Sequence, residues 1–125
     1  MMTSVQSDAV RVRSLITRFV EVCLEQYEIV YSLGSTSRYN RLFAEMQRIK
    51  AELQQMPGDQ RRALLPLLSH SNVQVQLRAA HSLLVLFPEA ARKCLENIRD
   101  SGIEPQNGEA ATAIRRLDEG SYVPE

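Results

Sequence analysis

The sequence predicts an all-α protein of about six helices joined by short loops. Three observations support this class. Apolar residues recur at intervals of three and four along most of the chain, which is the spacing of one face of an α-helix. Glycine, proline and short polar runs, which are typical of helix ends, separate these segments. No segment convincingly shows the alternation of apolar and polar residues expected of a half-buried strand.

Two long helices are predicted to form a hairpin at the start of the chain. The first covers about residues 5–33, where the apolar positions mostly recur at three and four: Val12, Leu15, Phe19, Val22, Val30 and Leu33. Gly34 offers a C-terminal stop, and the polar run 35–37 can cap the next helix. That second helix, about residues 38–55, carries one apolar stripe at coiled-coil spacing: Tyr39, Leu42, Met46, Ile49, Leu53 and Met56. Because Pro57 and Gly58 end the stripe after two heptads, it indicates packing inside a bundle.

A short proline-containing helix and a strongly apolar helix come next. Asp59 can cap residues 60–68, where Pro66 removes one backbone hydrogen bond and is expected to bend the helix. Asn72 is the expected cap of the following helix. The polar positions of that helix fall on one narrow arc with Val85: Gln74, Arg78, His81 and Ser82. Two apolar stripes occupy the remaining surface, so we expect this helix to be central and its polar arc to be solvated.

Two further helices complete the predicted fold. Pro88 lies where a first helical turn tolerates proline, and the inner face of its helix carries Ala91, Cys94, Leu95 and Ile98. Gly102, followed by an isoleucine, is expected to end this helix with a Schellman motif. The last helix stops at Gly120 and has an apolar face of Ala110, Ala113, Ile114 and Leu117. Residues 121–125 form a tail that is expected to fray unless Tyr122 and Val123 pack back.

The stretch LLPLLSHSNVQVQLRAAHSLL, residues 64–84, has the pattern of a HEAT-like repeat. A bent helix and a short turn precede a helix in which the small side chains of Ala79 and Ala80 allow close stacking. A two-helix unit of this kind cannot bury its apolar face alone. Neighbouring helix pairs are therefore expected to cover it.

Four motifs extend this pattern, in order, over residues 51–124: AELQQMPGDQRRALLPLLSHSNVQVQLRAAHSLL, PEAARKCLENIRDSG, PQNGEAA and LDEGSYVP. With these motifs the sequence resembles a small bacterial HEAT-like family, a domain of unknown function with ARM/HEAT-like helical repeats. The resemblance implies a right-handed α–α superhelix of HEAT-like helix pairs and brings no catalytic residues. It also implies the role suspected for family members, that of an immunity protein that acts beside a bacterial toxin.

We expect one HEAT-like domain over residues 1–125. Residues 1–57 would form an N-terminal hairpin that caps the stack, residues 58–120 would form the helix pairs, and residues 121–125 would form the tail.

Position 76 departs from the pattern of HEAT-like repeats. These repeats often place arginine directly after the valine at the start of the second helix, whereas this chain has Gln76. The position falls inside the apolar arc, where an unpaired amide would cost about 1–3 kcal/mol. We therefore expect Gln76 to bond to backbone or to a neighbouring polar side chain.

Composition argues against several classes of function. The chain has 125 residues, of which 44% are hydrophobic and 24% are charged, as in an average globular protein. Its apolar runs are too short to span a bilayer and its start lacks an apolar signal core, so we expect a cytoplasmic protein without a membrane partner. A net charge of zero removes long-range attraction to nucleic acids. Cys23 and Cys94 lack metal-site or redox spacing and are expected to be buried and reduced.

Neither histidine is predicted to take part in catalysis. The segment 69–72, which contains His70, has the composition of a polar turn with an N-cap, and no acid is placed by sequence to orient the imidazole. His81 lies beside Arg78 on the polar arc. Two histidines without spaced carboxylates or thiolates make a poor metal site. We predict no catalytic residue, metal or cofactor.

Arginines of the middle segment are the main candidates for binding. Residues 34–62 carry six basic and three acidic side chains, and Arg38, Arg41 and Arg48 are compatible with one exposed stripe. Glu45 and Glu52 interleave with them and can pair three or four residues away, so a merely solvated face is the leading interpretation. An acidic protein partner ranks second. Nucleic acid ranks third, because aromatic interleaving and net positive charge are missing.

These observations together predict a non-enzymatic module that binds another protein, in its most specific form an immunity protein that neutralises a toxin. The candidate contact residues are Arg38, Arg41, Arg61, Arg78 and His81. One alternative is an enzyme or small-molecule-binding domain on the concave face, for which a deep pocket joining His70 or His81 to a carboxylate would be the distinguishing feature. The second alternative is nucleic-acid binding through residues 38–62.

Overall fold

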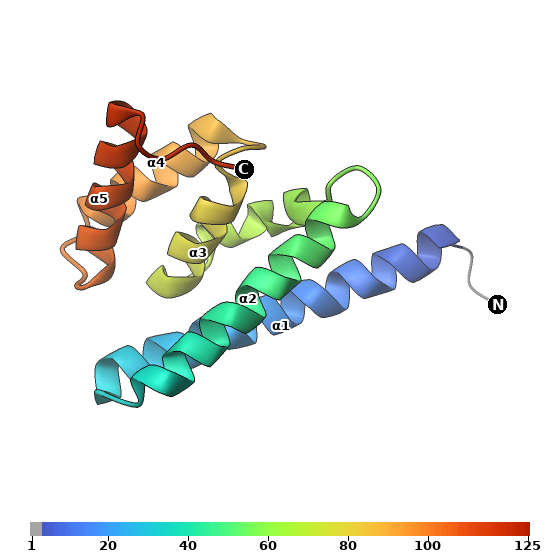
Figure 1. Cartoon of the computed structure of the whole chain (residues 1–125), viewed down its shortest axis with the longest axis horizontal. Helices are drawn as coiled ribbons and strands as arrows, with labels where there is room; N and C mark the ends of the chain where they lie inside the picture. Colours follow the sequence, from blue (N-terminus) through green and yellow to red (C-terminus); the bar gives the residue numbers. More distant parts are fainter. Residues whose placement is uncertain (1–3) are drawn as a thin grey trace. The chain divides into compact units, whose positions relative to one another are not determined.

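The computed structural model describes residues 4–125, with side chains from residue 7 onward, and their regular secondary structure is entirely helical. The described residues form five α-helices and one 3₁₀ helix (Figure 1): α1 (Ser4–Ser32), α2 (Thr36–Gln55), η1 (Gln60–Ser69), α3 (Val73–Leu83), α4 (Pro88–Arg99) and α5 (Gln106–Glu119). The all-α prediction is confirmed. Backbone contacts group into two compact units, unit 1 (residues 1–63) and unit 2 (residues 64–125), and each is described by itself. The organisation as one domain stays a prediction.

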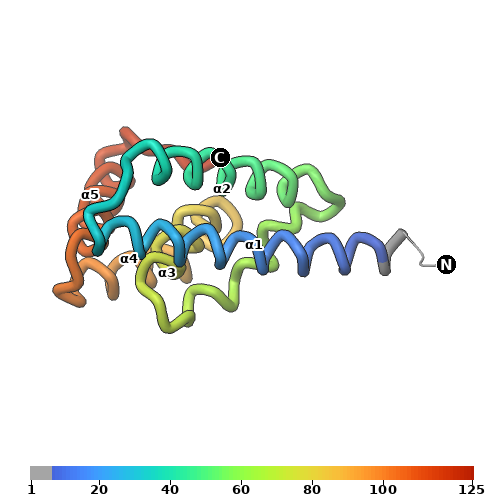
Figure 2. The backbone as a smooth tube through the Cα atoms, turned by 90° about the horizontal axis from the view of Figure 1, so that it is seen from below, coloured from blue at the N-terminus to red at the C-terminus, as the bar shows by residue number. Residues whose placement is uncertain are grey.

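Unit 1 is built on a long antiparallel hairpin. Helices α1 and α2 lie side by side in both views (Figures 1 and 2). The predicted apolar faces are buried along the middle of each helix: Leu15, Phe19 and Val22 on α1, and Leu42, Met46, Ile49 and Leu53 on α2. Ser35 caps α2 as expected, because its hydroxyl oxygen accepts a hydrogen bond of 3.2 Å from the backbone N–H of Arg38.

Three ion pairs connect the two helices of this hairpin. They lie seven residues apart on each helix: Arg11 with Glu52, Arg18 with Glu45, and Glu25 with Arg38. The middle pair is bidentate, since Arg18 donates from Nε and Nη2 to the two carboxylate oxygens of Glu45 at 2.7 and 2.9 Å. The outer pair Glu25–Arg38 is longer, at 3.7 Å. Because a spacing of seven residues is two helical turns, the three pairs lie along one edge of the hairpin.

In the turn between α1 and α2, the residue with left-handed backbone conformation is Leu33, one position before the glycine that was expected to end the helix. The backbone N–H of Gly34 donates to the carbonyl of Ile29 at 2.9 Å, which closes the helix end as the sequence indicates. This hydrogen bond joins residues five positions apart, and it requires the residue before Gly34 to adopt a left-handed conformation. Leu33 therefore has a φ of 53°, although its side chain is 92% exposed and gains little from packing.

Replacing Leu33 with glycine is expected to raise the free energy of unfolding by up to about 1 kcal/mol, because glycine adopts positive φ without the Cβ clash. Urea denaturation monitored by circular dichroism measures this change. Leu33→Ala is the matched control: it removes the exposed side chain but keeps Cβ, so it should give no such gain. A loss of stability in the glycine variant would contradict strain at this turn.

The third element is a 3₁₀ helix, whereas the sequence indicated a bent α-helix. Pro66 lies inside η1 and has no N–H to donate to the Arg62 carbonyl, and its ring would crowd that carbonyl in an α-helix. The predicted cap is present: Asp59 Oδ1 accepts a hydrogen bond from the backbone N–H of Arg61 at 3.3 Å. The HEAT-like repeat, which the sequence assigned to a bent α-helix at this position, stays a prediction.

Helix α3 is the central element of unit 2 and contacts both α4 and α5. Asn72 caps it as predicted, since its side-chain oxygen accepts hydrogen bonds from the N–H groups of Gln74 and Val75 at 2.9 and 3.3 Å. Both predicted apolar stripes are largely buried: Val73, Leu77, Ala80 and Leu84 on one, and Val75, Ala79 and Leu83 on the other. The expectation that Gln76 finds a polar partner is confirmed, because its Nε2 donates to the carbonyl oxygen of His70.

The polar arc of α3 is largely buried, so the expectation of a solvated face was wrong. Gln74, Arg78 and Ser82 are all buried. Helix α5 supplies partners for two of them: Gln74 Oε1 accepts from Gln106 Nε2, and Arg78 Nη1 donates to Glu109 Oε1, each at 3.0 Å. Polar groups can be buried here because facing polar groups on α5 supply hydrogen bonds to Gln74 and Arg78.

Helices α4 and α5 follow the prediction closely. The inner face of α4 is buried at Ala91, Cys94, Leu95 and Ile98, and that of α5 at Ala110, Ala113 and Ile114. Gly102 has the left-handed conformation, but the Schellman motif expected there was wrong. Helix α4 already ends at Arg99, and the backbone N–H of Ile103 donates to the hydroxyl oxygen of Ser101 at 3.1 Å. Gly120 ends α5 in a Schellman motif, with Gly120 N–H donating to the Leu117 carbonyl and Ser121 N–H to the Arg116 carbonyl.

Candidate functional site

The five predicted contact residues occupy three different environments. Arg38 and Arg41 line a depression on α2, and His81 lines a pocket in unit 2. Arg61 is only 5% exposed, and its guanidinium donates to both carboxylate oxygens of Asp59 at 2.9 and 2.6 Å. Arg78 is 8% exposed and is bonded to Glu109. Arg61 and Arg78 therefore form ion pairs within the fold. Their guanidinium groups are not exposed to a partner, contrary to what the sequence predicted.

A depression of about 480 Å³ lies along the surface of α2, and we call it the arginine depression. Its lining consists of α2 residues alone: Arg38, Arg41, Leu42, Ala44, Glu45 and Arg48. The predicted stripe of arginines is confirmed, since all three line this one surface. Ala44 is small and exposed, so it leaves room between the longer side chains.

The acidic residues of α2 do not neutralise these arginines as the sequence indicated. Glu45 and Glu52 pair with Arg18 and Arg11 of α1 and not with their neighbours on α2. Within the described residues, neither Arg41 nor Arg48 forms an ion pair. The hairpin packing therefore leaves the depression with more positive than negative charge, which is a long-range effect that helical spacing alone cannot reveal.

The charge of Glu45 is fixed by its partner on α1. Hydrogen bonds from Arg18, and then the positive charges of Arg18 and Arg48, hold the pKa of Glu45 below the ordinary value of 4.5 against the opposing effect of burial. Glu45 is therefore ionised at neutral pH and remains committed to Arg18. It contributes one negative charge to the floor of the depression, while Arg41 and Arg48 form no ion pair among the described residues.

Glu45→Gln is expected to lower the free energy of unfolding by about 1 kcal/mol at pH 7. Because the folded-state pKa is depressed, this contribution is present above pH 4.5 and is lost as the pH falls through the folded-state value. Urea unfolding of wild type and variant at pH 7 and pH 3 measures the difference, which should shrink at pH 3. Glu21→Gln is the control, since Glu21 lies farther from Arg18, at 3.4 Å, and is more exposed. A difference that is equal at both pH values would contradict the assignment.

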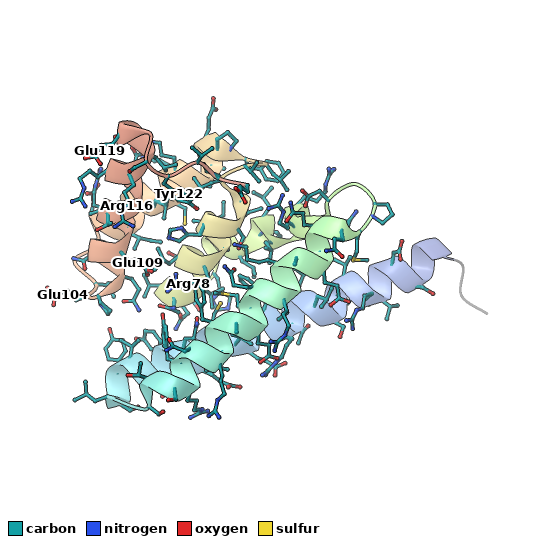
Figure 3. All side chains as sticks on the ribbon, in the orientation of Figure 1. Arg78, Glu104, Glu109, Arg116, Glu119 and Tyr122 are labelled. Atoms are coloured by element: carbon teal, nitrogen blue, oxygen red, sulfur yellow. The ribbon has the colours of Figure 1, made fainter. Side chains whose placement is uncertain are left out.

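A second pocket, of about 330 Å³, lies in unit 2, and we call it the α3–α5 pocket. Its lining comes from α3, α5 and the residues after Gly120: His81, Glu109, Thr112, Ala113, Arg116, Ser121 and Tyr122. The α5 members lie at intervals of three, one and three, so they share one face of the helix. Figure 3 shows Glu109 and Arg116 on α5, with Arg78 on α3 and Tyr122 on the tail.

The tail packs back onto unit 2 at Tyr122, one of the two outcomes that the sequence left open. The backbone N–H groups of Ser121 and Tyr122 both donate to the carbonyl oxygen of Arg116, at 3.0 and 3.2 Å. The ring of Tyr122 then lies 6.2 Å from the ring of His81, measured between centroids. Burial raises the pKa of Tyr122 above its ordinary value of 10, so its hydroxyl group stays protonated at neutral pH. Val123 is exposed.

The remaining reactive side chains have structural surroundings. His70 Nδ1 accepts a hydrogen bond of 2.9 Å from the backbone N–H of Asn72, which supports the predicted polar turn. Cys23 and Cys94 are buried and form no disulfide, and burial raises the pKa of Cys94 to about 11. Nowhere in residues 4–125 do three or more His, Cys, Asp or Glu side chains gather as they would around a metal ion. None of the described helices has both the length and the apolar character needed to cross a bilayer.

Comparison with known proteins places this fold in a family. The chain matches the model of a domain of unknown function, DUF2019, over residues 13–118. It is also similar to the protein RPA1889 from Rhodopseudomonas palustris CGA009, whose crystal structure matches with a TM-score of 0.88. The two sequences are 39% identical, and the match covers 91% of this chain and 93% of that chain. No curated protein matches the chain. Since the family model spans most of the sequence, the chain belongs to the DUF2019 family.

Proposed function

We propose that the protein is a non-enzymatic module that binds an acidic segment of another protein through the arginine depression. The observation that carries this proposal is the pairing of Glu45 and Glu52 with arginines of α1, which leaves Arg41 and Arg48 without an ion pair among the described residues. Charge complementarity selects an acidic partner, because desolvating these guanidinium groups against an apolar surface would be unfavourable.

The rigidity of the hairpin supports this role. The arginines project from a continuous helix whose apolar stripe is buried, so the backbone needs no ordering when a partner binds. Arginine is suited to such contacts because its planar guanidinium can form two parallel hydrogen bonds with one carboxylate. Leu42 and Ala44 provide an apolar floor between the charged groups. A few anchors of this kind carry most of the affinity in many protein interfaces.

The most specific form of the proposal is an immunity protein whose arginine depression docks on an acidic surface of a cognate toxin and blocks it. This form rests on the family resemblance of the sequence. The HEAT-like stacking of the helix pairs in unit 2 is a prediction of the same resemblance.

Protein is favoured over nucleic acid as the partner because the basic segment 38–62 is not a continuous charged surface. Arg61 is buried and ion-paired with Asp59, and the Nε of Arg62 donates a hydrogen bond to the backbone carbonyl of Asp59 at 3.4 Å. The net charge of the chain is zero. Phosphate backbones reward several adjacent cations, and this segment offers three on one helix face.

The test is affinity capture from the native host with the wild-type chain and with the double variant Arg41→Glu/Arg48→Glu, followed by mass spectrometry. A protein bound by wild type and lost from the variant is then titrated by calorimetry. We expect at least tenfold weaker binding to the variant and weaker binding at higher salt. The control is Arg13→Glu/Arg115→Glu, which makes the same change of charge at two exposed arginines outside the depression.

Two results would contradict the proposal. One is a captured partner that binds the double variant as tightly as wild type. The other is tighter binding of duplex DNA or single-stranded RNA than of any captured protein, measured at moderate salt with the same variants. That second result would assign the arginine depression to phosphate recognition.

A further inference from the structure

The α3–α5 pocket is formed by residues of unit 2 alone, and the proposed binding function does not use it. Its lining contains both His81 and the carboxylate Glu109, two kinds of side chain that recur in ligand sites. Its volume of about 330 Å³ lies at the lower end of the range for small-molecule sites.

The charges in this pocket are not balanced. Glu109 accepts a hydrogen bond of 3.0 Å from the buried guanidinium of Arg78, so its negative charge is largely offset within the fold. Arg116 has no such partner among the described residues, and its guanidinium forms no ion pair or hydrogen bond there. Glu119, three residues farther along α5, is paired with Arg115 at 3.9 Å. The pocket therefore presents one free positive charge.

Two hydroxyl-bearing side chains, Tyr122 and Thr112, line the same pocket as Arg116. Tyr122 is held in the pocket wall by the backbone hydrogen bonds of residues 121 and 122 to the Arg116 carbonyl. Its hydroxyl group is protonated at neutral pH and can donate. Thr112 also lines the pocket, and its hydroxyl forms no hydrogen bond in the described part of the chain. The carboxylate of Glu109 lies on the same wall, and because a carboxylate has several lone-pair positions it can accept a further hydrogen bond besides the one from Arg78 Nη1.

We infer that the α3–α5 pocket binds a small organic acid: the carboxylate pairs with Arg116, and a hydroxyl or amino group of the ligand donates to Glu109. The hydroxyl groups of Tyr122 and Thr112 donate to the remaining ligand oxygens. A planar carboxylate fits the fork of an arginine side chain, and the size of the pocket suits a molecule of a few to about fifteen heavy atoms.

The test is titration of the ¹⁵N-labelled full chain with three 2-hydroxy acids of increasing size, lactate, malate and mandelate, at constant ionic strength. We expect saturable shifts of the backbone signals of Ser121 and Tyr122 and of the Arg116 side-chain Nε–H, at concentrations up to the order of 10 mM. Mandelamide, the neutral analogue, should bind at least about tenfold more weakly because it has no carboxylate for Arg116. Inorganic phosphate is the second comparison ligand and should also bind more weakly, because its additional negative charge would lie beside the carboxylate of Glu109.

Variants separate the site from general attraction of anions. Arg116→Gln should weaken binding at least about tenfold, and Tyr122→Phe should weaken it to a smaller extent. Arg115→Gln is the matched control, since it removes the same charge one residue away and outside the pocket, and it should bind like wild type. Arg116 is exposed, so its variant should keep the wild-type spectrum away from the pocket.

Three results would overturn the inference: no saturable shift with any of the hydroxy acids, equal binding by Arg116→Gln, or equal binding of phosphate. Loss of the partner in the capture experiment would leave this inference standing, because the two sites share no residue.

Discussion

Phe19→Ala is expected to lower the free energy of unfolding by about 3–5 kcal/mol, the largest effect that we predict for this chain. Phe19 lies at the middle of α1 and has no solvent-exposed surface. Removing its ring deletes apolar contacts and leaves a cavity that the packed helices can close only in part. The hairpin of unit 1 should therefore lose a large share of its stability.

Urea denaturation followed by circular dichroism measures this loss. Phe43→Ala is the matched control, because Phe43 is a phenylalanine of the same hairpin whose residue surface is 38% exposed. It should cost clearly less than Phe19→Ala. Equal losses in the two variants would mean that Phe19 does not anchor a packed core.

Leu77→Ala is expected to cost about 2–5 kcal/mol. Leu77 lies at the centre of α3, is fully buried, and belongs to the stripe that also contains Ala80. Helix α3 contacts both α4 and α5, so a cavity here affects every helix pair of unit 2. Because α5 carries most of the α3–α5 pocket, signals of Arg116 and Tyr122 should also shift in this variant.

The comparison for Leu77 is Leu65→Ala, a leucine of the same unit that is 37% exposed. Urea denaturation of both variants gives the two free energies of unfolding. It is followed by far-ultraviolet circular dichroism, because the chain has no tryptophan for fluorescence. A cost for Leu77→Ala below that of Leu65→Ala would show that α3 is not the core of its unit.

Sequence reasoning succeeded where the controlling interactions are local. The stripe of α2 from Leu42 to Leu53, the cap at Asn72 and the stop at Gly120 each depend on a few neighbouring residues, and the structure confirms all of them. The conformation of Leu33 could not be predicted in the same way. Glycine is the better left-handed residue, but the hydrogen bond of Gly34 fixes which position must turn.

The failures concern contacts between segments that are distant in sequence. The sequence around Arg78 does not indicate that Glu109 will pair with it. The sequence around Glu45 does not indicate that it will pair with Arg18, 27 residues earlier, instead of with an arginine of α2. The arc of α3 looked solvated because its polar partners lie on α5. A polar arc on a helix that must contact neighbours on two sides leaves both outcomes open, and only tertiary packing decides between them.

The candidate sites were predictable to different extents. Arg38, Arg41 and Arg48 follow from helical spacing, and they do line one surface. The members of the α3–α5 pocket other than His81 were missed. The spacing of Glu109, Thr112 and Arg116 on one face of α5 was a usable signal, but the position of Tyr122 depends on a turn after Gly120 that composition does not reveal.

The three ion pairs of the hairpin have a polarity that fixes its register. On α1 the series reads Arg11, Arg18, Glu25, and its last member has the opposite sign to the first two. If one helix slid by a heptad, which would keep the apolar seam in phase, Arg18 would face Arg38 in one direction and Glu25 would face Glu45 in the other. The reversed charge order of the pair Glu25–Arg38 therefore disfavours both misalignments through like-charge repulsion. The hairpin accordingly assembles with a single alignment of α1 and α2.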